Sequence, residues 1–276
     1  MIRAVIYHLN CGTMCPRAAP RLGLVDRDPG HLVARCVLIE DASGLILIDT
    51  GFGTRDVATP ARLGPARLLL APRLTLAETA LAQIRALGYD PGDVRHVLVT
   101  HLDLDHAGGL ADFPNAEIHL HAVELDVVRR RPLAARLRYR FGQWDHGPHW
   151  AEHAETGEPW YGFERVKLID GLKVEIAMIP LFGHTAGHSG YAINAGERWL
   201  LHAGDAYLRQ GEIASPPRST RALDAYHALN SDDRARRHEN AERLAALTRD
   251  HHDVTVFCSH DPAELRRDTA GPLADR

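Results

Sequence analysis

A chain of 276 residues, 45% of them hydrophobic and 25% charged, has the composition of a globular protein with a large core. Its formal net charge of -4 offers no basic field to nucleic acid, and no apolar run reaches the roughly 18 residues of a membrane span, so neither is expected as a partner. The four cysteines lack C-x-x-C spacing, which predicts reduced thiols. Residues 1–8 have the pattern of a strand instead of a signal peptide, so a cytoplasmic location is expected.

The first part of the chain predicts a hairpin and then a helix. Apolar runs at 32–40 and 44–49 flank a short polar turn, and residues 52–74, rich in arginine and broken by prolines, read as an excursion over the surface. Thr75 and Glu78 form a capping-box pattern ahead of apolar residues at helical spacing, so a helix is expected to start at Thr75.

Further along, strands and helices alternate, with two more hairpins. The expected strands are residues 94–99, 116–120, 165–169, 172–179, 191–194, 199–202 and 254–258, and the expected helices are 123–130 and 232–249. This order favours an α/β fold with sheets packed between helices over an all-parallel doubly wound sheet. No repeat or linker divides the chain, so one domain over residues 1–276 is expected, with a frayed tail from Glu264.

The densest motif, H-L-D-L-D-H, follows the strand expected at 94–99. It crowds four side chains of metal-ligand type into six residues: His101, Asp103, Asp105 and His106. Folding gains nothing from this crowding, whereas a divalent metal ion gains its usual nitrogen and oxygen donors. Three later segments also end a strand with such a side chain beside a small residue, namely His184, Asp205 and His260. Because strand ends project loops into a shared cleft, the sequence predicts a metal centre.

These segments resemble the signature of the metallo-β-lactamase superfamily, H-x-H-x-D-H followed by separated His, Asp and His ligands. The segment 45–51 also resembles the family's second hairpin strand and its turn, so the resemblance spans residues 30 to 262. It implies an α/β fold of the family's type, a four-layered αββα sandwich with metal ions at one edge of the sheets.

The resemblance implies a set of ligands for two divalent ions. One ion would take His101 and His184, the other Asp105, His106 and His260, and Asp205 would bridge both. A hydroxide held between the ions, formed because coordination lowers the pKa of water, would attack a carbonyl or a related electrophile. Because Asp105 would bind one of the ions that hold this hydroxide, the resemblance implies that it is a catalytic residue as well as a ligand.

Asp103 departs from the family pattern, which has a histidine at this position. Aspartate is shorter, so Asp103 is expected to bind directly, bind through water, or leave its ion under-coordinated. With two divalent ions, three carboxylates and one hydroxide the centre would be neutral, where the histidine version would carry +1. An added oxygen donor also favours harder ions. Zinc is the first expectation, with manganese or iron as the alternatives.

Several neighbouring residues are candidates for supporting roles. His188 resembles the second histidine of the family's G-H-x-x-G-H turn and is expected to brace that turn instead of binding metal. Asp49 either orients a ligand histidine or simply forms its own turn. His119 and His121 alternate on one strand beside no glycine or aspartate motif, so they are not expected to be ligands.

The segment 139–163 holds seven of the chain's 17 aromatic residues. We expect an insertion around 130–163 that walls the substrate pocket, the alternative being an apolar patch that anchors a long loop. The six arginines between 129 and 140 are interpreted as a solvated helical face. Tyr207 lies two residues after Asp205, the expected bridging ligand. In acyl-homoserine lactonases, a tyrosine one residue further along assists at the substrate carbonyl, so Tyr207 resembles that residue. A core tyrosine is the alternative.

The expected function is that of a metal-dependent hydrolase that opens a small, largely apolar ester or lactone. Two features favour this substrate class. One is the resemblance to the N-acyl homoserine lactonase branch, which extends to residues 10–14, and the other is the aromatic segment 139–163. Other hydrolases of the fold, of thioesterase, phosphotriesterase or sulfatase type, share the same ligands. A diiron redox protein, suggested by Asp103, and a binding module without catalysis are the remaining alternatives. A homodimer is an open expectation.

Overall fold

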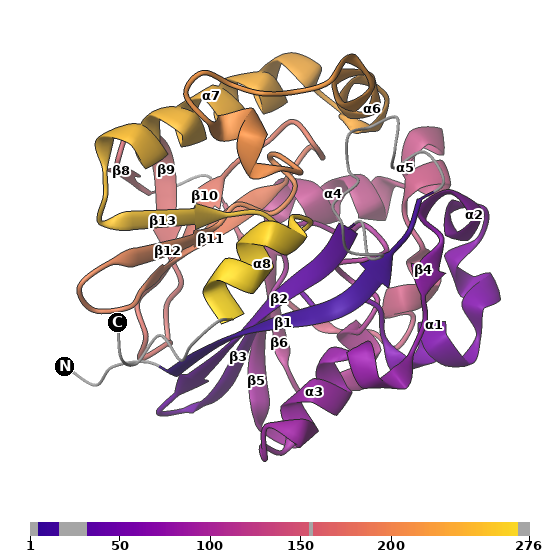
Figure 1. The fold of residues 1–276 in the computed structure, drawn as a ribbon. Helices are drawn as coiled ribbons and strands as arrows, with labels where there is room; N and C mark the ends of the chain where they lie inside the picture. Colours follow the sequence, from indigo (N-terminus) through magenta and orange to yellow (C-terminus); the bar gives the residue numbers. More distant parts are fainter. Residues whose placement is uncertain (1–4, 17–31, 155–156, 270–276) are drawn as a thin grey trace.

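Two β-sheets lie face to face, and helices cover their outer faces (Figure 1). The structure is a computed structural model that describes residues 5–16, 32–154 and 157–269. In the described chain the first sheet has seven strands in the order β4-β1-β2-β3-β5-β6-β7, and the second has six in the order β13-β12-β11-β10-β9-β8. This is the expected α/β, four-layered αββα sandwich.

The first sheet joins an antiparallel half to a parallel half. Its strands are β1 (Val5–Met14), β2 (Leu32–Asp41), β3 (Gly44–Ile48), β4 (Pro72–Arg73), β5 (Val94–Leu98), β6 (Glu117–His121) and β7 (His149–His153). Strands β1 to β3 pair antiparallel, and β3, β5, β6 and β7 pair parallel. The carboxyl ends of β3, β5 and β6 therefore lie at one edge, which is where the dense histidine motif begins.

The second sheet brings three more strand ends together. Its strands are β8 (Glu158–Trp160), β9 (Phe163–Leu168), β10 (Ile176–Pro180), β11 (Ser189–Asn194), β12 (Trp199–His202) and β13 (Val254–Phe257). Strand β11 is antiparallel to both β10 and β12, and β12 is parallel to β13. Strands β10, β12 and β13 consequently run in the same direction, and the loops that follow them leave the sheet at a common edge.

Helices form the outer layers. They are α1 (Thr54–Ala58), α2 (Ala66–Leu70), α3 (Ala80–Ala86), α4 (Ala122–Arg130), α5 (Leu133–Arg138), α6 (Arg221–Asn230), α7 (Arg234–Asp250) and α8 (Pro262–Thr269), with short 3-10 turns between them. Ile84 of α3 and Leu125 of α4 belong to the apolar cluster on the outer face of the first sheet. Leu244 and Leu247 of α7 belong to the cluster on the outer face of the second. Helices α3, α4 and α7 thus each bury apolar residues against the outer face of a sheet.

The core between the sheets explains why the central strands read as continuous apolar runs. Ile46 and Ile48 of β3 face the second sheet, where Met178 and Tyr191 meet them. Leu47, one residue away on the same strand, faces the helices instead. A strand covered on both faces must be apolar at every position, which removes the alternation expected of a half-exposed strand.

The helix expected to start at Thr75 starts later, so that prediction was wrong. Residues Leu76–Glu78 form a 3-10 turn, and the N-cap of α3 is Thr79, whose hydroxyl accepts the Ala82 N–H. The Glu78 carboxylate does not complete a capping box, because it accepts the backbone N–H of Thr13 at 2.8 Å. A long-range hydrogen bond has displaced the local one.

The tail expected to fray from Glu264 is ordered helix as far as Thr269. The Glu264 side chain is buried and accepts the Cys258 N–H at 2.8 Å, which ties α8 to the end of β13. Residues 270–276 lie outside the described chain. Within the described ranges, no helix is both long and apolar enough to cross a membrane.

The aromatic insertion also differs from expectation. Its seven aromatic side chains divide between the two outer cores: Tyr139, Phe141, Trp144 and Trp150 pack on the first sheet's cluster, and Trp160, Tyr161 and Phe163 on the second's. The contacts are those of anchors that hold a long connection to the body of the protein. These contacts favour the alternative, an apolar anchor for a long loop, and the pocket wall stays a prediction.

Candidate metal centre

All seven side chains proposed as ligands from the sequence gather at the edge where the strand ends meet. The loop after β5 carries His101, Asp103, Asp105 and His106, and the loops after β10, β12 and β13 carry His184, Asp205 and His260. Residues separated by up to about 160 positions in the chain thus share one site because six strands of two sheets end at the same edge.

One half of the site has the dimensions of a tetrahedral metal cage. The Asp103 Oδ2 atom lies 3.3 Å from His101 Nε2 and 3.2 Å from His184 Nε2. The Asp205 Oδ2 atom lies 3.9 Å and 3.4 Å from the same two nitrogens. Donors bound at about 2.0–2.2 Å to one tetrahedral ion stand roughly 3.3–3.6 Å apart, so His101, Asp103 and His184 lie close enough together to share an ion, with Asp205 next to them.

The other half is built around the same Asp205. Its Oδ1 atom lies 3.3 Å from His106 Nε2, and its Oδ2 atom lies 2.9 Å from His260 Nε2. The Asp105 Oδ2 atom lies 4.0 Å and 3.7 Å from those two nitrogens. Asp205 is therefore the carboxylate common to both halves.

Three of these atoms lie near opposite charges but make no hydrogen bond to the described residues. Within the described chain, His101 Nε2, His106 Nε2 and Asp205 Oδ1 are buried and accept or donate no hydrogen bond. Leaving buried polar atoms unsatisfied is costly unless a cation or another group fills the space between them. Burial and the neighbouring His106 lower the pKa of His101 to about 4, so its imidazole stays neutral and keeps a lone pair. The donor set therefore fits divalent metal ions.

The opposite ring nitrogens are held by hydrogen bonds that aim the free nitrogens into the site. Asp49 Oδ2 accepts from His106 Nδ1 at 2.8 Å, and the Val33 carbonyl accepts from His260 Nδ1 at 2.7 Å. Asp49 also accepts the N–H and the hydroxyl of Thr100. Of the two interpretations offered for Asp49, the structure supports the orienting one, because its carboxylate fixes the tautomer and the plane of an imidazole.

His188 braces its turn, as expected. Its Nδ1 donates to the Leu181 carbonyl at 2.9 Å and its Nε2 accepts the backbone N–H of Asp205 at 2.9 Å. Both ring nitrogens are engaged, so the side chain positions Asp205 without facing an ion.

Glu124 of α4 is a further organising residue that the sequence did not reveal. Its buried carboxylate accepts the Leu102 N–H from the first loop and the Thr185 hydroxyl and Gly187 N–H from the second. The Tyr139 hydroxyl donates to it as well. One side chain thus fixes the loop of His101 against the loop of His184. Nothing distinguishes Glu124 in the sequence from any glutamate in a first helical turn.

Asp103 is paired with Arg138, which sequence analysis had placed on a solvated helical face. That interpretation is wrong for Arg138: its Nε donates to Asp103 Oδ1 at 2.7 Å and its Nη2 to Asp103 Oδ2 at 2.6 Å. Burial alone would raise the pKa of Asp103, but the Arg138 guanidinium holds it well below its usual value. The pair carries no net charge, as a neutral histidine would. In the expected centre with two divalent ions and a hydroxide, Arg138 would restore the +1 that Asp103 removes.

Arg138 also reaches a second ligand candidate. Its Nη2 lies 2.9 Å from His184 Nε2, and its Nη1 donates to the Asn230 carbonyl of α6 at 3.0 Å. The lone pair on His184 can serve either the guanidinium or a metal ion. No motif marks Arg138, because it reaches the site through the way α5 and α6 pack and not through its place in the sequence.

Tyr207 does not reach the centre. Its ring is fully buried, and its hydroxyl donates to Glu264 Oε1 at 3.0 Å. Another tyrosine, Tyr226 of α6, lies near enough to the carboxylates to feel their charge. Burial and the charges of Asp205, Asp105 and Asp103 raise the pKa of Tyr226, so its phenol stays protonated. The core interpretation of Tyr207 is the one the structure supports.

An apolar cluster lies beside the centre. Its buried members are Met14, Leu32, Phe52, Leu63, Leu104, Leu208 and Leu223, and Tyr226 packs against them. Leu104 sits between Asp103 and Asp105 in the chain, and Leu208 follows Asp205 by three residues, so the cluster adjoins the donor atoms. A separate cavity of about 420 Å³, lined by residues such as Ile213, Thr248 and Val256, contains none of the ligand candidates.

Comparison with known proteins decides the family. The sequence profile described as "Metallo-beta-lactamase superfamily" matches residues 29–260. The chain belongs to this superfamily. A similar curated protein, the probable metallo-hydrolase Rv2300c of Mycobacterium tuberculosis, is 42% identical over 269 residues, which cover 96% of this chain and 83% of the relative. The protein is accordingly a metal-dependent hydrolase of the metallo-β-lactamase superfamily.

Lactonases of the superfamily are more distant relatives. The N-acyl homoserine lactonase of Bacillus thuringiensis is 29% identical over 108 residues, or 37% of this chain and 43% of the lactonase. A solved structure of an N-acyl homoserine lactone hydrolase, with the product N-hexanoyl-L-homoserine at its catalytic metal center, superposes with a TM-score of 0.70 at 19% identity and 97% coverage of both chains. A probable metal-dependent hydrolase from Staphylococcus aureus gives a TM-score of 0.65 at 20% identity, with 94% of this chain and 90% of that chain covered. These superpositions show a shared fold.

Proposed function

We propose that this hydrolase opens a small, largely apolar ester or lactone with the help of two divalent ions, zinc in the first instance. The observation that carries the proposal is the arrangement of unsatisfied, buried donor atoms on both sides of Asp205, directly beside an apolar cluster. Donors on two sides of a shared carboxylate suit a pair of ions, and the apolar neighbours suit a substrate with little charge.

The proposed ligand sets follow the two halves of the site. His101, Asp103, His184 and Asp205 would hold one ion; Asp105, His106, His260 and Asp205 would hold the other. When bound, the ions supply a water of lowered pKa and polarise the substrate's carbonyl oxygen. Mixed nitrogen and oxygen donors suit zinc, and the extra oxygen of Asp103 extends the range toward manganese and iron.

The protein's own groups prepare this chemistry before substrate arrives. The Asp49 carboxylate and the Val33 carbonyl hold His106 and His260 at fixed orientations. Arg138 neutralises Asp103, so the site keeps the positive charge that attracts a carbonyl oxygen as it becomes negative. These groups are in place without any movement of the strands, which lowers the reorganisation needed during the reaction.

Tyr226 is the proposed hydrogen-bond donor to the substrate. Its hydroxyl makes no hydrogen bond to any residue in the described ranges, and the neighbouring carboxylates keep it protonated. A phenol in that state can donate to the carbonyl oxygen of an ester or lactone as charge develops there. Phe52, Leu104 and Leu208, which are almost fully buried, would form the apolar layer behind the substrate site.

The test combines elemental analysis with a substrate panel. Protein purified without added metal would be analysed for zinc, manganese and iron, then assayed on lactones, aryl esters, thioesters and phosphoesters, with and without a chelator. We expect about two equivalents of metal, and turnover of lactones or aryl esters that chelation abolishes and metal restores. Protein without any bound transition metal contradicts the metal centre. Turnover of thioesters or phosphoesters alone contradicts the substrate class, and visible iron absorbance without hydrolysis indicates a redox protein.

A further inference from the structure

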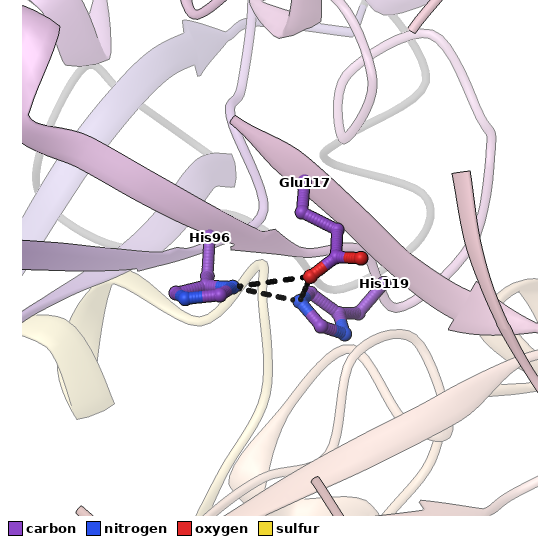
Figure 2. Close-up of side chains that lie close together, drawn as sticks. All are labelled: His96, Glu117 and His119. Atoms are coloured by element: carbon purple, nitrogen blue, oxygen red, sulfur yellow. Dashed lines mark hydrogen bonds and ion pairs between the residues drawn. The ribbon is translucent and has the colours of Figure 1, made fainter. Parts of the chain in front are cut away.

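A second group of histidines and a carboxylate lies outside the centre described above, on the body of the first sheet. Figure 2 shows His96 of β5 with Glu117 and His119 of β6, their polar atoms turned toward one another. His96 Nδ1 lies 2.9 Å from His119 Nε2, and Glu117 Oε2 lies 3.7 Å and 3.5 Å from these two nitrogens. The three donor atoms thus lie within 3.7 Å of one another, and the two nitrogens stand at hydrogen-bond distance, so they would have to move slightly apart to bind an ion.

Strand register produces this convergence. In the parallel β5–β6 pair, His96 stands opposite Glu117 and Leu98 opposite His119. His96 shares a strand face with Leu98, which belongs to the core between the sheets. An apolar residue at position 96 or 119 would extend that core, yet both positions carry imidazoles, and the His119 side chain is only 4% exposed. Stability alone does not favour polar groups at these positions.

The group combines a buried end with an open end. His119 is almost fully enclosed, whereas the side chains of His96 and Glu117 are 19% and 53% exposed. A small ion can enter from the Glu117 side, and water can complete its coordination there. This is the usual arrangement of a three-ligand metal site with open positions.

A third histidine orients the buried one. His153 Nε2, from the adjacent strand β7, lies 3.0 Å from His119 Nδ1, and the two rings stack at an interplanar angle of 12°. Engaging Nδ1 leaves His119 Nε2 to face His96 and Glu117, as metal-binding imidazoles are normally held by their second nitrogen. Burial and the neighbouring His153 and His96 lower the pKa of His119 to about 3, which leaves its ring neutral.

We propose that His96, Glu117 and His119 bind one divalent transition-metal ion of the zinc class, at a site separate from the catalytic centre. Two imidazoles and one carboxylate suit zinc, iron or nickel and do not suit calcium or magnesium, which prefer oxygen donors throughout. The ion links β5 to β6 directly and β7 through His153. Its role is structural: it fastens the edge strand that the long insertion contributes to the sheet.

The competing account is a hydrogen-bonded row of histidines that holds no ion. In that case His96, His119 and His153 pass hydrogen bonds from ring to ring, and Glu117 only approaches them from solvent. The two accounts differ in what the loss of the Glu117 charge does. A metal site loses a donor and its affinity, whereas a row of histidines keeps both of its hydrogen bonds.

The experiment measures zinc binding by equilibrium dialysis of full-length protein freed of metal. The variants are Glu117→Gln and His96→Gln, with Glu164→Gln on β9 as the matched control because that carboxylate is also exposed on a strand. We expect the first two variants to bind one equivalent less than the wild type, or to bind that equivalent at least about tenfold more weakly. The control should bind as the wild type does, and ester hydrolysis should be unchanged in all three.

Thermal melting supplies a second readout that does not depend on the catalytic centre. In Asp205→Asn protein, added zinc should still raise the melting temperature, and the further change Glu117→Gln should remove that rise. Equal zinc binding by wild type, Glu117→Gln and His96→Gln overturns the proposal, as does an equal loss in the Glu164→Gln control. Loss of an equivalent in Glu117→Gln from a protein without hydrolase activity would instead leave this site standing and refute the proposed function.

Discussion

The two histidine–carboxylate clusters use the same side chains but are built in opposite ways. In the candidate metal centre the donors lie on loops beyond the strand ends, and His101 Nε2 and His106 Nε2 make no hydrogen bond within the described ranges. In the second cluster the donors lie on the strands themselves, and His96 and His119 already contact each other at 2.9 Å. The first arrangement is unsatisfied without a cation, whereas the second can satisfy itself. We therefore expect a chelator to strip the strand-borne site first.

The largest expected effect comes from Asp205, the carboxylate shared by both halves of the centre. Changing Asp205→Asn removes the charge that faces four imidazoles, so hydrolysis should fall by about 100- to 1,000-fold and the metal content should fall with it. Steady-state kinetics and elemental analysis measure both. Full metal content with turnover reduced less than about tenfold would show that Asp205 is not the shared ligand.

Glu264 is a buried carboxylate that differs from those of the two clusters. Its hydrogen bonds come from the Tyr207 hydroxyl and the Cys258 N–H instead of from imidazoles or a guanidinium. Glu264 is 1% exposed, and burial raises its pKa from the usual 4.5 to about 7. Between pH 4.5 and about 7, the folded protein therefore keeps the Glu264 proton that the unfolded chain has lost. The free energy of unfolding consequently falls as the pH rises through this range, by about 3 kcal/mol in total.

Glu264→Gln should flatten that dependence, because the amide does not titrate. Denaturant unfolding at a series of pH values from 4 to about 8 measures it, with Glu164→Gln as the exposed control. A slope in Glu264→Gln equal to that of the wild type would assign the dependence to other groups.

The Asp103–Arg138 pair can be tested by exchange for the residue that the family pattern has there. Asp103→His alone places an imidazole against the Arg138 guanidinium, which has then lost its two hydrogen bonds to Asp103, so metal affinity and turnover should fall by about tenfold or more. Asp103→His with Arg138→Gln removes both charges together and should recover most of the loss. A double-mutant cycle on metal affinity checks this, and additive effects of the two changes would mean that the pair does not act as a unit.

The smallest effect is expected at Tyr207. Its hydroxyl donates to Glu264 away from the centre, so Tyr207→Phe should cost about 1 kcal/mol of stability and leave hydrolysis within about twofold of the wild type. Tyr226→Phe, by comparison, should lower kcat by about tenfold. Kinetics on the two variants side by side decide which phenol serves the substrate, and the reverse order would restore Tyr207 to that role.

The ligand candidates were accessible from the sequence for a physical reason. Metal-binding side chains cluster after strand ends, and a divalent ion demands residue types that folding alone would not place together. The strands themselves were also predictable, because apolar runs such as 44–49 cannot be solvated. The fold class and the positions of the central strands therefore agree with the structure.

What the sequence left hidden depends on tertiary packing. Arg138 pairs with Asp103 only because α5 lies over the loop after β5, and a run of six arginines gives no sign of which one turns inward. Thr75 was a wrong helix start because Glu78 binds Thr13, 65 residues away. The aromatic rings of the insertion were assigned to a pocket, yet composition alone does not distinguish a pocket wall from an anchor.

The Glu124 carboxylate ties together two loops that come from different sheets. It joins the loop of His101 to the loop of His184 through hydrogen bonds made by the protein's own groups. Part of the order of these loops is therefore supplied by the chain itself, so that holding an ion there would require less further ordering. A single buried carboxylate on α4 thus acts as the clasp between the two halves of the sandwich at the site.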